Sequence, residues 1–131
     1  MIVDTSALIA ILFLEPEARL FSDLIAQTVD CCISAANYLE AAIVLDAAHN
    51  PIVSRRLDEL IRNADISVEP VTAAQAKIAR EAYRDFGKGS GHPAQLNFGD
   101  CFAYALARDR GEPLLFKGND FSQTDISSAS D

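Results

Sequence analysis

The sequence contains few cysteines, and its longest apolar stretch is too short to cross a membrane. Its three cysteines, Cys31, Cys32 and Cys101, form no CxxC or Cys/His metal-binding spacing and no disulfide framework. We therefore expect a reducing, cytoplasmic setting. The stretch from Ala7 to Leu14 falls short of the roughly 20 apolar residues that a membrane span requires. It also lacks the basic flank of a signal peptide, so we expect neither feature.

Basic residues are also scarce. The chain holds 11 Lys and Arg against 19 Asp and Glu, which gives a formal net charge of −8 at pH 7. Such a chain is not a general polyanion-binding protein, because it repels phosphate backbones over most of its length. The basic residues are concentrated between positions 55 and 88. Any nucleic acid must therefore be held near this central region or through a bound metal ion.

Several common catalytic and binding motifs are missing. There is no phosphate-binding Walker loop and no GxGxxG, and the glycine-rich loop from Gly87 to Gly91 follows a predicted helix rather than a strand. His49 and His92 have no nucleophilic serine or cysteine in an elbow sequence nearby, which argues against a hydrolase triad. Cys101 is expected to be a small core residue. These absences argue against a nucleophilic triad and against a nucleotide-binding loop.

The hydrophobic pattern alternates between strand and helix. It predicts strands over residues 2–4, 31–33, 66–71 and 114–116, and helices over residues 5–14, 16–27, 35–48, 52–63, 73–86 and 98–110. Alternation of this kind predicts an α/β fold in which a mainly parallel sheet carries helices on both faces. Residues 1–126 are long enough for one domain with a real core. The Ser-rich residues 127–131 are expected to form a mobile tail.

Four acidic residues lie among apolar neighbours, where carboxylates are rare: Asp4, Glu40, Asp100 and Asp120. Burying an isolated carboxylate costs several kcal/mol or forces it to bind a proton. A shared divalent cation would offset this cost. Asp4 and Asp120 follow predicted strands, while Glu40 and Asp100 lie in the first two turns of helices. All four can therefore meet at the carboxyl edge of a parallel sheet, where ligands collect in such folds.

Each of these acids also has an ordinary structural interpretation. Asp4 can cap the helix that starts at Thr5, and Asp100 can be a first-turn acid favoured by the helix dipole. Asp120 belongs to a Gly-Asn-Asp turn sequence, and Glu40 can simply be exposed. Glu40 is the hardest to explain in this way, because its helix is apolar on nearly every face. The joint occurrence of the four favours the metal site.

A basic stripe follows the helix predicted over residues 73–86. Lys77, Arg80 and Arg84 line one side of it, and Lys88 extends the stripe into the next loop. Most such stripes are solvated helix faces. The functional alternative is contact with RNA phosphates, for which we single out Arg80, Arg84 and Lys88.

Longer motifs resemble a known family from one end of the chain to the other. They are Met1-Ile2-Val3-Asp4-Thr5-Ser6-Ala7-Leu8, Ser34-Ala35-Ala36-Asn37-Tyr38-Leu39-Glu40, Phe86-Gly87-Lys88-Gly89 with His92-Pro93-Ala94, Leu96-Asn97-Phe98-Gly99-Asp100-Cys101, and Leu114-Leu115-Phe116-Lys117-Gly118-Asn119-Asp120-Phe121 with Thr124-Asp125-Ile126. In this order they resemble the PIN-domain family, and most closely the VapC toxins of bacterial toxin–antitoxin pairs.

The resemblance implies a three-layer α/β/α sandwich and an Mg²⁺- or Mn²⁺-dependent endoribonuclease that cuts structured RNA such as tRNA. Asp4, Glu40, Asp100 and Asp120 match the acidic quartet of the family. Thr5 and Ser6 match the polar residues beside the first acid. It further implies a homodimer neutralised by a VapB-type antitoxin, with operator DNA reached only through that antitoxin. Gly118 stands where relatives often carry a hydroxyl residue, so we assign it no chemical role.

The chemistry agrees with this assignment. Phosphodiester hydrolysis needs an activated water, a clamp on developing charge and a stabilised leaving oxygen, and one or two metal ions can supply all three. Asp4 and Asp100 are expected to ligate directly, and Glu40 directly or through water, orienting the attacking water. Asp120 would complete a second, weaker site, with Asn119 sharing or water-bridging the last ligand position.

A phosphatase, a receiver domain and a non-enzymatic module are the alternatives to a nuclease. A haloacid-dehalogenase phosphatase needs a second Asp where this chain has Ser6, and a receiver domain needs an acid pair that is missing. The non-enzymatic alternative is an inactive module that only binds an antitoxin and takes part in operator-bound autoregulation. RNA cleavage by the purified, partner-free protein distinguishes this module from a nuclease.

Overall fold

Short apolar strands and longer helices alternate along the chain, as the sequence pattern predicts. The computed structural model describes residues 1–131 and places the strands in one sheet with the order β3-β2-β1-β4, every neighbouring pair being parallel. The strands are β1 (Ile2–Val3), β2 (Cys31–Ser34), β3 (Ile66–Glu69) and β4 (Leu114–Leu115). The helices are α1 (Thr5–Leu12), α2 (Ala18–Gln27), α3 (Ala35–Ala47), α4 (Pro51–Asn63), α5 (Ala73–Phe86), α6 (Phe98–Arg110) and the 3₁₀ helix η1 (Phe121–Gln123).

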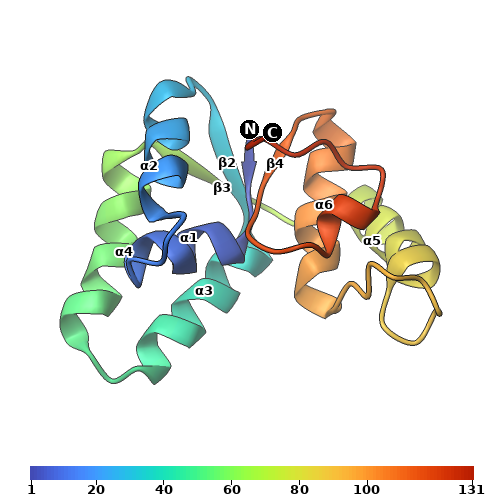
Figure 1. The fold of residues 1–131 in the computed structure, drawn as a ribbon, viewed down its shortest axis with the longest axis horizontal. Coiled ribbons are helices and arrows are strands. Elements are labelled where there is room, and N and C mark those ends of the chain that lie inside the picture. Colours follow the sequence, from blue (N-terminus) through green and yellow to red (C-terminus); the bar gives the residue numbers. More distant parts are fainter.

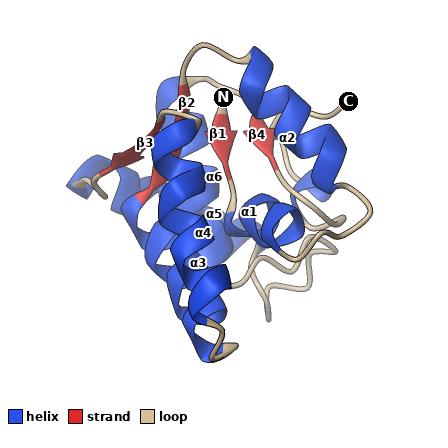
Figure 2. Cartoon of the chain, turned by 90° about the vertical axis from the view of Figure 1, so that its left-hand side faces the viewer, coloured by secondary structure: helices blue, strands red, loops and turns tan.

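The two faces of the sheet are buried in separate cores. Successive side chains of a strand point to opposite faces, so Ile2 packs with buried residues of α5 and α6, whereas Val3 packs with those of α1 to α4. Leu114 and Leu115 divide in the same way. Figure 1 shows the sheet between these two groups of helices, and Figure 2 shows the four strands side by side. The predicted α/β fold with helices on both faces is confirmed.

The central position of β1 defines where a ligand would bind. Strand β2 lies on one side of β1 and β4 on the other, so the connection after β1 leads to one side and the connection after β3 crosses to the other. In such sheets the crevice at the carboxyl ends of the diverging strands is the usual ligand site. Asp4 directly follows β1, and the loop from Lys117 to Asp120 follows β4. The topology therefore brings two distant acidic segments to the same edge.

The helix boundaries differ from the prediction around Pro16. Helix α1 ends at Leu12 in a Schellman arrangement, in which the Leu14 N–H donates to Ile11 O (3.2 Å) and the Glu15 N–H donates to Ala10 O (2.9 Å). Leu14 adopts a left-handed φ of 54°. Helix α2 then begins at Ala18, so the prediction that Pro16 lies in its first turn is wrong. The turn that closes α1 includes Phe13 and Leu14, which were predicted to belong to the first helix.

The strand predicted over residues 66–71 is also shorter than expected. It ends at Glu69, one residue before Pro70, whose missing N–H cannot continue the ladder. None of the helices is long and apolar enough to cross a membrane. At the carboxyl terminus, the Leu114 N–H donates to Ser127 O and the Ala129 N–H donates to Leu114 O, both at 2.9 Å. The mobility of residues 127–131 stays a prediction.

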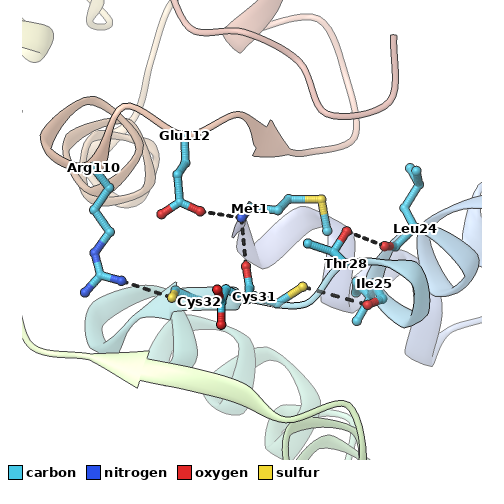
Figure 3. Close-up of polar contacts among 9 residues, drawn as sticks. Met1, Leu24, Ile25, Thr28, Cys31, Cys32, Arg110 and Glu112 are labelled. Carbon is cyan, nitrogen blue, oxygen red and sulfur yellow. Dashed lines mark hydrogen bonds and ion pairs between the residues drawn. The ribbon is translucent and has the colours of Figure 1, made fainter.

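Two acidic side chains outside the set of four, Glu112 and Glu69, have cationic partners. The amino group of Met1 donates to the Glu112 carboxylate and to the carbonyl oxygen of Asp30 (Figure 3). Arg110 donates to Cys32 Sγ at 3.1 Å and pairs with Glu69 at 3.0 Å. Each of these two carboxylates is thus paired with a nearby cation, which is the normal requirement for partly buried carboxylates.

Candidate metal centre

Asp4 is the most deeply buried acid of the carboxyl edge. It is 3% exposed and caps α1, since its Oδ2 accepts hydrogen bonds from the Ser6 N–H (3.0 Å) and from Ser6 Oγ (2.6 Å). Its Oδ1 is buried without any hydrogen-bond partner. Burial raises the pKa of Asp4 to about 7, with further contributions from the charges of Asp100 and Glu40, while the Ser6 hydrogen bonds act in the opposite direction. The capping role therefore accounts for only one of the two oxygens.

The two hydroxyl residues after Asp4 connect it to other elements. Ser6 Oγ donates to Asp4 and accepts the Lys117 N–H at 3.0 Å, so it ties the end of β1 to the loop after β4. Thr5 Oγ1 donates to Asn37 O at 3.0 Å in α3. These bonds fix Asp4 relative to two neighbouring segments, which is how rigid surroundings hold a ligand in place.

Glu40 lies one turn into α3 and rests against the start of α6. Gly99 has no side chain, and a Cβ built on it would come within 2.1 Å of Glu40 Oε2. Asn37, which is 1% exposed, donates through Nδ2 to Gly99 O (2.9 Å) and to Glu40 Oε1 (3.4 Å). The Glu40 carboxylate thus occupies the space that any larger residue at position 99 would fill.

Asp100 stands in the first turn of α6, where it belongs to a capping box with Asn97. The Asn97 N–H donates to Asp100 Oδ2 and the Asp100 N–H donates to Asn97 Oδ1, both at 2.9 Å. Partial burial raises the pKa of Asp100, as do the charges of Asp120 and Glu40, whereas Lys88 lowers it. Asp100 therefore interacts electrostatically with each of the other three acids and with one cation.

Asp120 is the most exposed of the four. It precedes η1 without a side-chain capping bond, and its charge acts on Asp100. Its neighbour Asn119 is exposed and uses its carbonyl oxygen to accept from Ser122 Oγ at 2.7 Å. Gly118 has a φ of 102°, a region that side-chain-bearing residues avoid. Glycine suits this backbone conformation, and Gly118 needs no chemical role to account for it.

The four acids lack cationic partners. None of Asp4, Glu40, Asp100 and Asp120 forms an ion pair. No three His, Cys, Asp or Glu side chains are close enough to form a closed ligand set. Mg²⁺, however, commonly binds through one or two carboxylates and keeps several waters. The unpartnered Oδ1 of Asp4, beside further carboxylates, fits this kind of hard cation.

The three basic residues expected to contact RNA lie in different surroundings. Lys88 is exposed and close enough to Asp100 to lower its pKa. Arg80 is exposed on α5 and lines a surface cavity together with aromatic residues of α6. Arg84 is paired with its neighbour Asp85 at 3.0 Å. Lys88 and Arg80 therefore have positive charge free of a carboxylate partner, and Arg84 does not.

Two residues of the site were not singled out from the sequence. Asn37 and Gly99 belong to two of the motifs that resemble the family, but neither was predicted to be a site residue. An asparagine three positions before Glu40, in an otherwise apolar helix, is the sequence signal that could have identified Asn37. The role of Gly99 depends on the approach of α3 to α6, which no local pattern reveals.

The sequence of the chain matches a known family and several of its members. The PIN domain matches residues 1–127. VapC ribonuclease Mb0625 of Mycobacterium bovis and ribonuclease VapC28 of Mycobacterium tuberculosis are each 60% identical over 131 residues, covering 100% of this chain and 98% of the relative. A ribonuclease VapC of Mycolicibacterium smegmatis is 48% identical over 126 residues, covering 96% of this chain and 97% of the relative.

A crystal structure supports the fold independently. Mycobacterium tuberculosis VapC20, described as a toxin that cleaves the sarcin-ricin loop, superposes with a TM-score of 0.75 over 95% of both chains. At 20% sequence identity this likeness concerns the fold alone.

Proposed function

This chain belongs to the PIN-domain family and is a ribonuclease toxin of the VapC type, and on that basis we propose that it hydrolyses RNA phosphodiester bonds with Mg²⁺ or Mn²⁺ held by Asp4, Glu40, Asp100 and Asp120. The observation that carries the proposal is Asp4 Oδ1, a buried carboxylate oxygen with no hydrogen-bond partner. Structural roles account for Asp4 Oδ2 and for the capping box of Asp100, but not for this oxygen.

The neighbouring residues prepare the acids for that role. Ser6 holds Asp4 Oδ2, and Asn37 steers the Glu40 carboxylate beside Gly99. A divalent cation held there would supply charge neutralisation at the phosphate and activation of the attacking water. Glu40 Oε2 can accept a hydrogen bond from the attacking water and fix its orientation. The more exposed Asp120 completes a second, weaker position beside Asp100.

The substrate of the proposal is a structured RNA such as tRNA. An acidic site repels the RNA backbone until a cation offsets its charge. Lys88 lies near Asp100 and can draw a phosphate toward the acids. A cytoplasmic location is part of the same proposal, and it is supported by three buried cysteines that are all free thiols.

Protein partners are expected to bind the surface formed by α1 to α4. Exposed apolar side chains gather on α1 to α4 and their connections, namely Phe13, Leu14, Leu20, Leu39, Ile43, Val44 and Ile52. Where such side chains form one contiguous patch, the patch marks a protein-interaction site. We propose that this surface serves a VapB-type antitoxin and a second copy of the chain, with operator DNA engaged only through the antitoxin.

The test is RNA cleavage by purified, antitoxin-free protein. With Mn²⁺ or Mg²⁺ the wild type should cut tRNA at defined positions, and EDTA should abolish cleavage without unfolding the protein. Asp4→Asn should remove both cleavage and the rise in melting temperature on adding Mn²⁺. Asp65→Asn is a matched control, because Asp65 lies in the turn between α4 and β3 with a φ of 54° that asparagine also tolerates.

Two results would contradict the proposal. Full cleavage in EDTA, or by Asp4→Asn, would exclude the metal mechanism. Absence of cleavage with either metal, in a folded protein that still binds its antitoxin, would instead support the inactive binding module.

A further inference from the structure

A surface cavity of about 250 Å³ lies between α5 and α6 and has no role in the proposed chemistry. One stripe of α5 forms one wall, with Ala76, Ala79, Arg80 and Tyr83 at the i, i+3, i+4 and i+7 spacing of a single helix face. The facing stripe of α6 contributes Phe98, Cys101 and Phe102. The small alanine side chains leave the cavity open, and the aromatic rings form its borders.

Phe98 is the unusual member of this set. It is the first residue of α6 and is 77% exposed, although a phenylalanine side chain gains most from burial. Its ring meets that of Phe102 edge to face, with centroids 4.9 Å apart. Tyr83 across the cavity is 44% exposed. Aromatic surface is therefore offered to solvent on two sides of one small hollow.

The cavity adjoins the candidate metal centre. Phe98 is followed by Gly99, against which the Glu40 carboxylate rests, and then by Asp100. The cavity and the acids therefore share the first turn of α6, on which Phe98 and Asp100 are separated by only about 3 Å along the helix axis. Arg80 is the one charged residue in the lining, so the cavity combines aromatic faces with a positive charge. This combination suits the bases and phosphates of single-stranded nucleic acid.

We propose that the cavity receives one unpaired nucleobase of the RNA, next to the phosphate being cut. The base stacks against Phe98 and Tyr83, and Arg80 contacts its face or the adjoining phosphate. Because the base must leave its own stack to enter, the protein selects loops or single strands over continuous duplex. This inference rests on the proposed ribonuclease function and names the feature of RNA that the same site recognises.

Size and position favour a base over a protein segment. The volume lies below the roughly 300–1,000 Å³ typical of drug-sized ligands, and it suits a single ring system. The wide set of exposed apolar side chains that a protein partner needs lies instead on α1 to α4.

The binding test needs neither metal nor cleavage. ¹⁵N-labelled protein in EDTA is titrated with the four nucleoside monophosphates and, separately, with ribose 5-phosphate, which has no base. We expect amide signals of Phe98, Cys101 and Phe102 to shift with nucleotides only. Phe98→Ala should weaken this binding by about 5- to 100-fold, the usual range for losing one stacking ring. Phe98→Trp should restore it, and Phe13→Ala is the matched control, since Phe13 is 43% exposed beside α1.

Cleavage kinetics separate this inference from the function on which it rests. Phe98→Ala should raise KM for RNA more than it lowers kcat. If the wild type binds nucleotides at the cavity but cuts no RNA, the proposed function fails and the base pocket stands. If RNA is cut and Phe98→Ala leaves KM unchanged, or ribose 5-phosphate shifts the same signals, the base pocket is refuted alone. It is equally refuted if Phe98→Ala only converts a dimer to a monomer in sedimentation.

Discussion

Replacing Gly99 with alanine should separate activity from stability. The added Cβ would lie 2.1 Å from Glu40 Oε2 and 2.7 Å from Glu40 Cδ. Non-bonded heavy atoms prefer separations of roughly 3.5 Å, so the carboxylate must retreat by more than about 1 Å. It is the end of a flexible side chain, and its movement costs the fold little. Alanine in place of a helical glycine contributes about 0.5–1 kcal/mol in the opposite direction.

The effect on catalysis should be far larger. A displacement of about 1 Å in a catalytic group can cost roughly 100-fold in rate. We therefore expect Gly99→Ala to lower kcat for RNA by about that factor while the free energy of unfolding, measured with urea by circular dichroism, stays within about 1 kcal/mol of wild type. The kcat is measured with Mn²⁺, and the free energy of unfolding is measured on the same preparation in EDTA, so that metal binding does not contribute to it.

A double-mutant cycle identifies the cause. In a Glu40→Ala background the carboxylate is gone, so Gly99→Ala should cause no further loss of activity and should stabilise the protein slightly. Cleavage by Gly99→Ala within threefold of wild type would refute the argument that this carboxylate acts from beside Gly99. A similar further loss in both backgrounds would show that alanine disturbs something other than Glu40.

Three further predictions concern stability. Because burial raises the pKa of Asp4 from 3.8 to about 7, the metal-free folded protein holds a proton that the unfolded chain releases between these values. The stability of metal-free wild type, relative to Asp4→Asn, should therefore fall by at most roughly 4 kcal/mol as pH rises from 4 to 7 and then level off; equal pH profiles in urea melts would disprove it. Tyr104→Phe should cost about 1 kcal/mol, since it removes a 2.7 Å hydrogen bond to the half-exposed Asp125; calorimetry of this variant against Tyr83→Phe, whose hydroxyl has no such bond, gives the measurement. Leu8→Ala should cost about 2–5 kcal/mol, because Leu8 is fully buried in the α1 to α4 core; a loss below 1 kcal/mol in chemical denaturation would mean that this core adjusts freely.

The secondary structure was predictable because its signals are local. Helices α3 and α6 begin after Ser34 and Asn97, which accept the hydrogen bonds expected of capping residues. Helix α6 ends at Gly111, whose φ of 63° is the left-handed value expected of a terminating glycine. The boundary at Pro16 was wrong, since the turn that closes α1 depends on backbone bonds spanning Ala10 to Glu15 rather than on the proline alone.

The four acids stood out in the sequence because their neighbours are apolar. The hydrogen bonds that each carboxylate forms could not be predicted in the same way. The sequence offered capping and metal binding as alternatives for Asp4 and Asp100. In the structure both residues are caps, yet each also interacts with the other acids. A carboxylate has two oxygens, and only the surrounding atoms decide whether the second one is satisfied.

The sequence by itself determined the element types and the sheet covered on both faces, and it predicted the four acids at one edge, because hydrophobic period, caps and strand-end positions are local properties. Tertiary structure alone decided the close approach of Glu40 to Gly99, the unpaired Asp4 Oδ1 and the cavity beside Phe98. Each of these depends on how closely two helices, or a helix and a strand end, approach one another. That distance is fixed by packing between segments far apart in the chain, and no single segment encodes it.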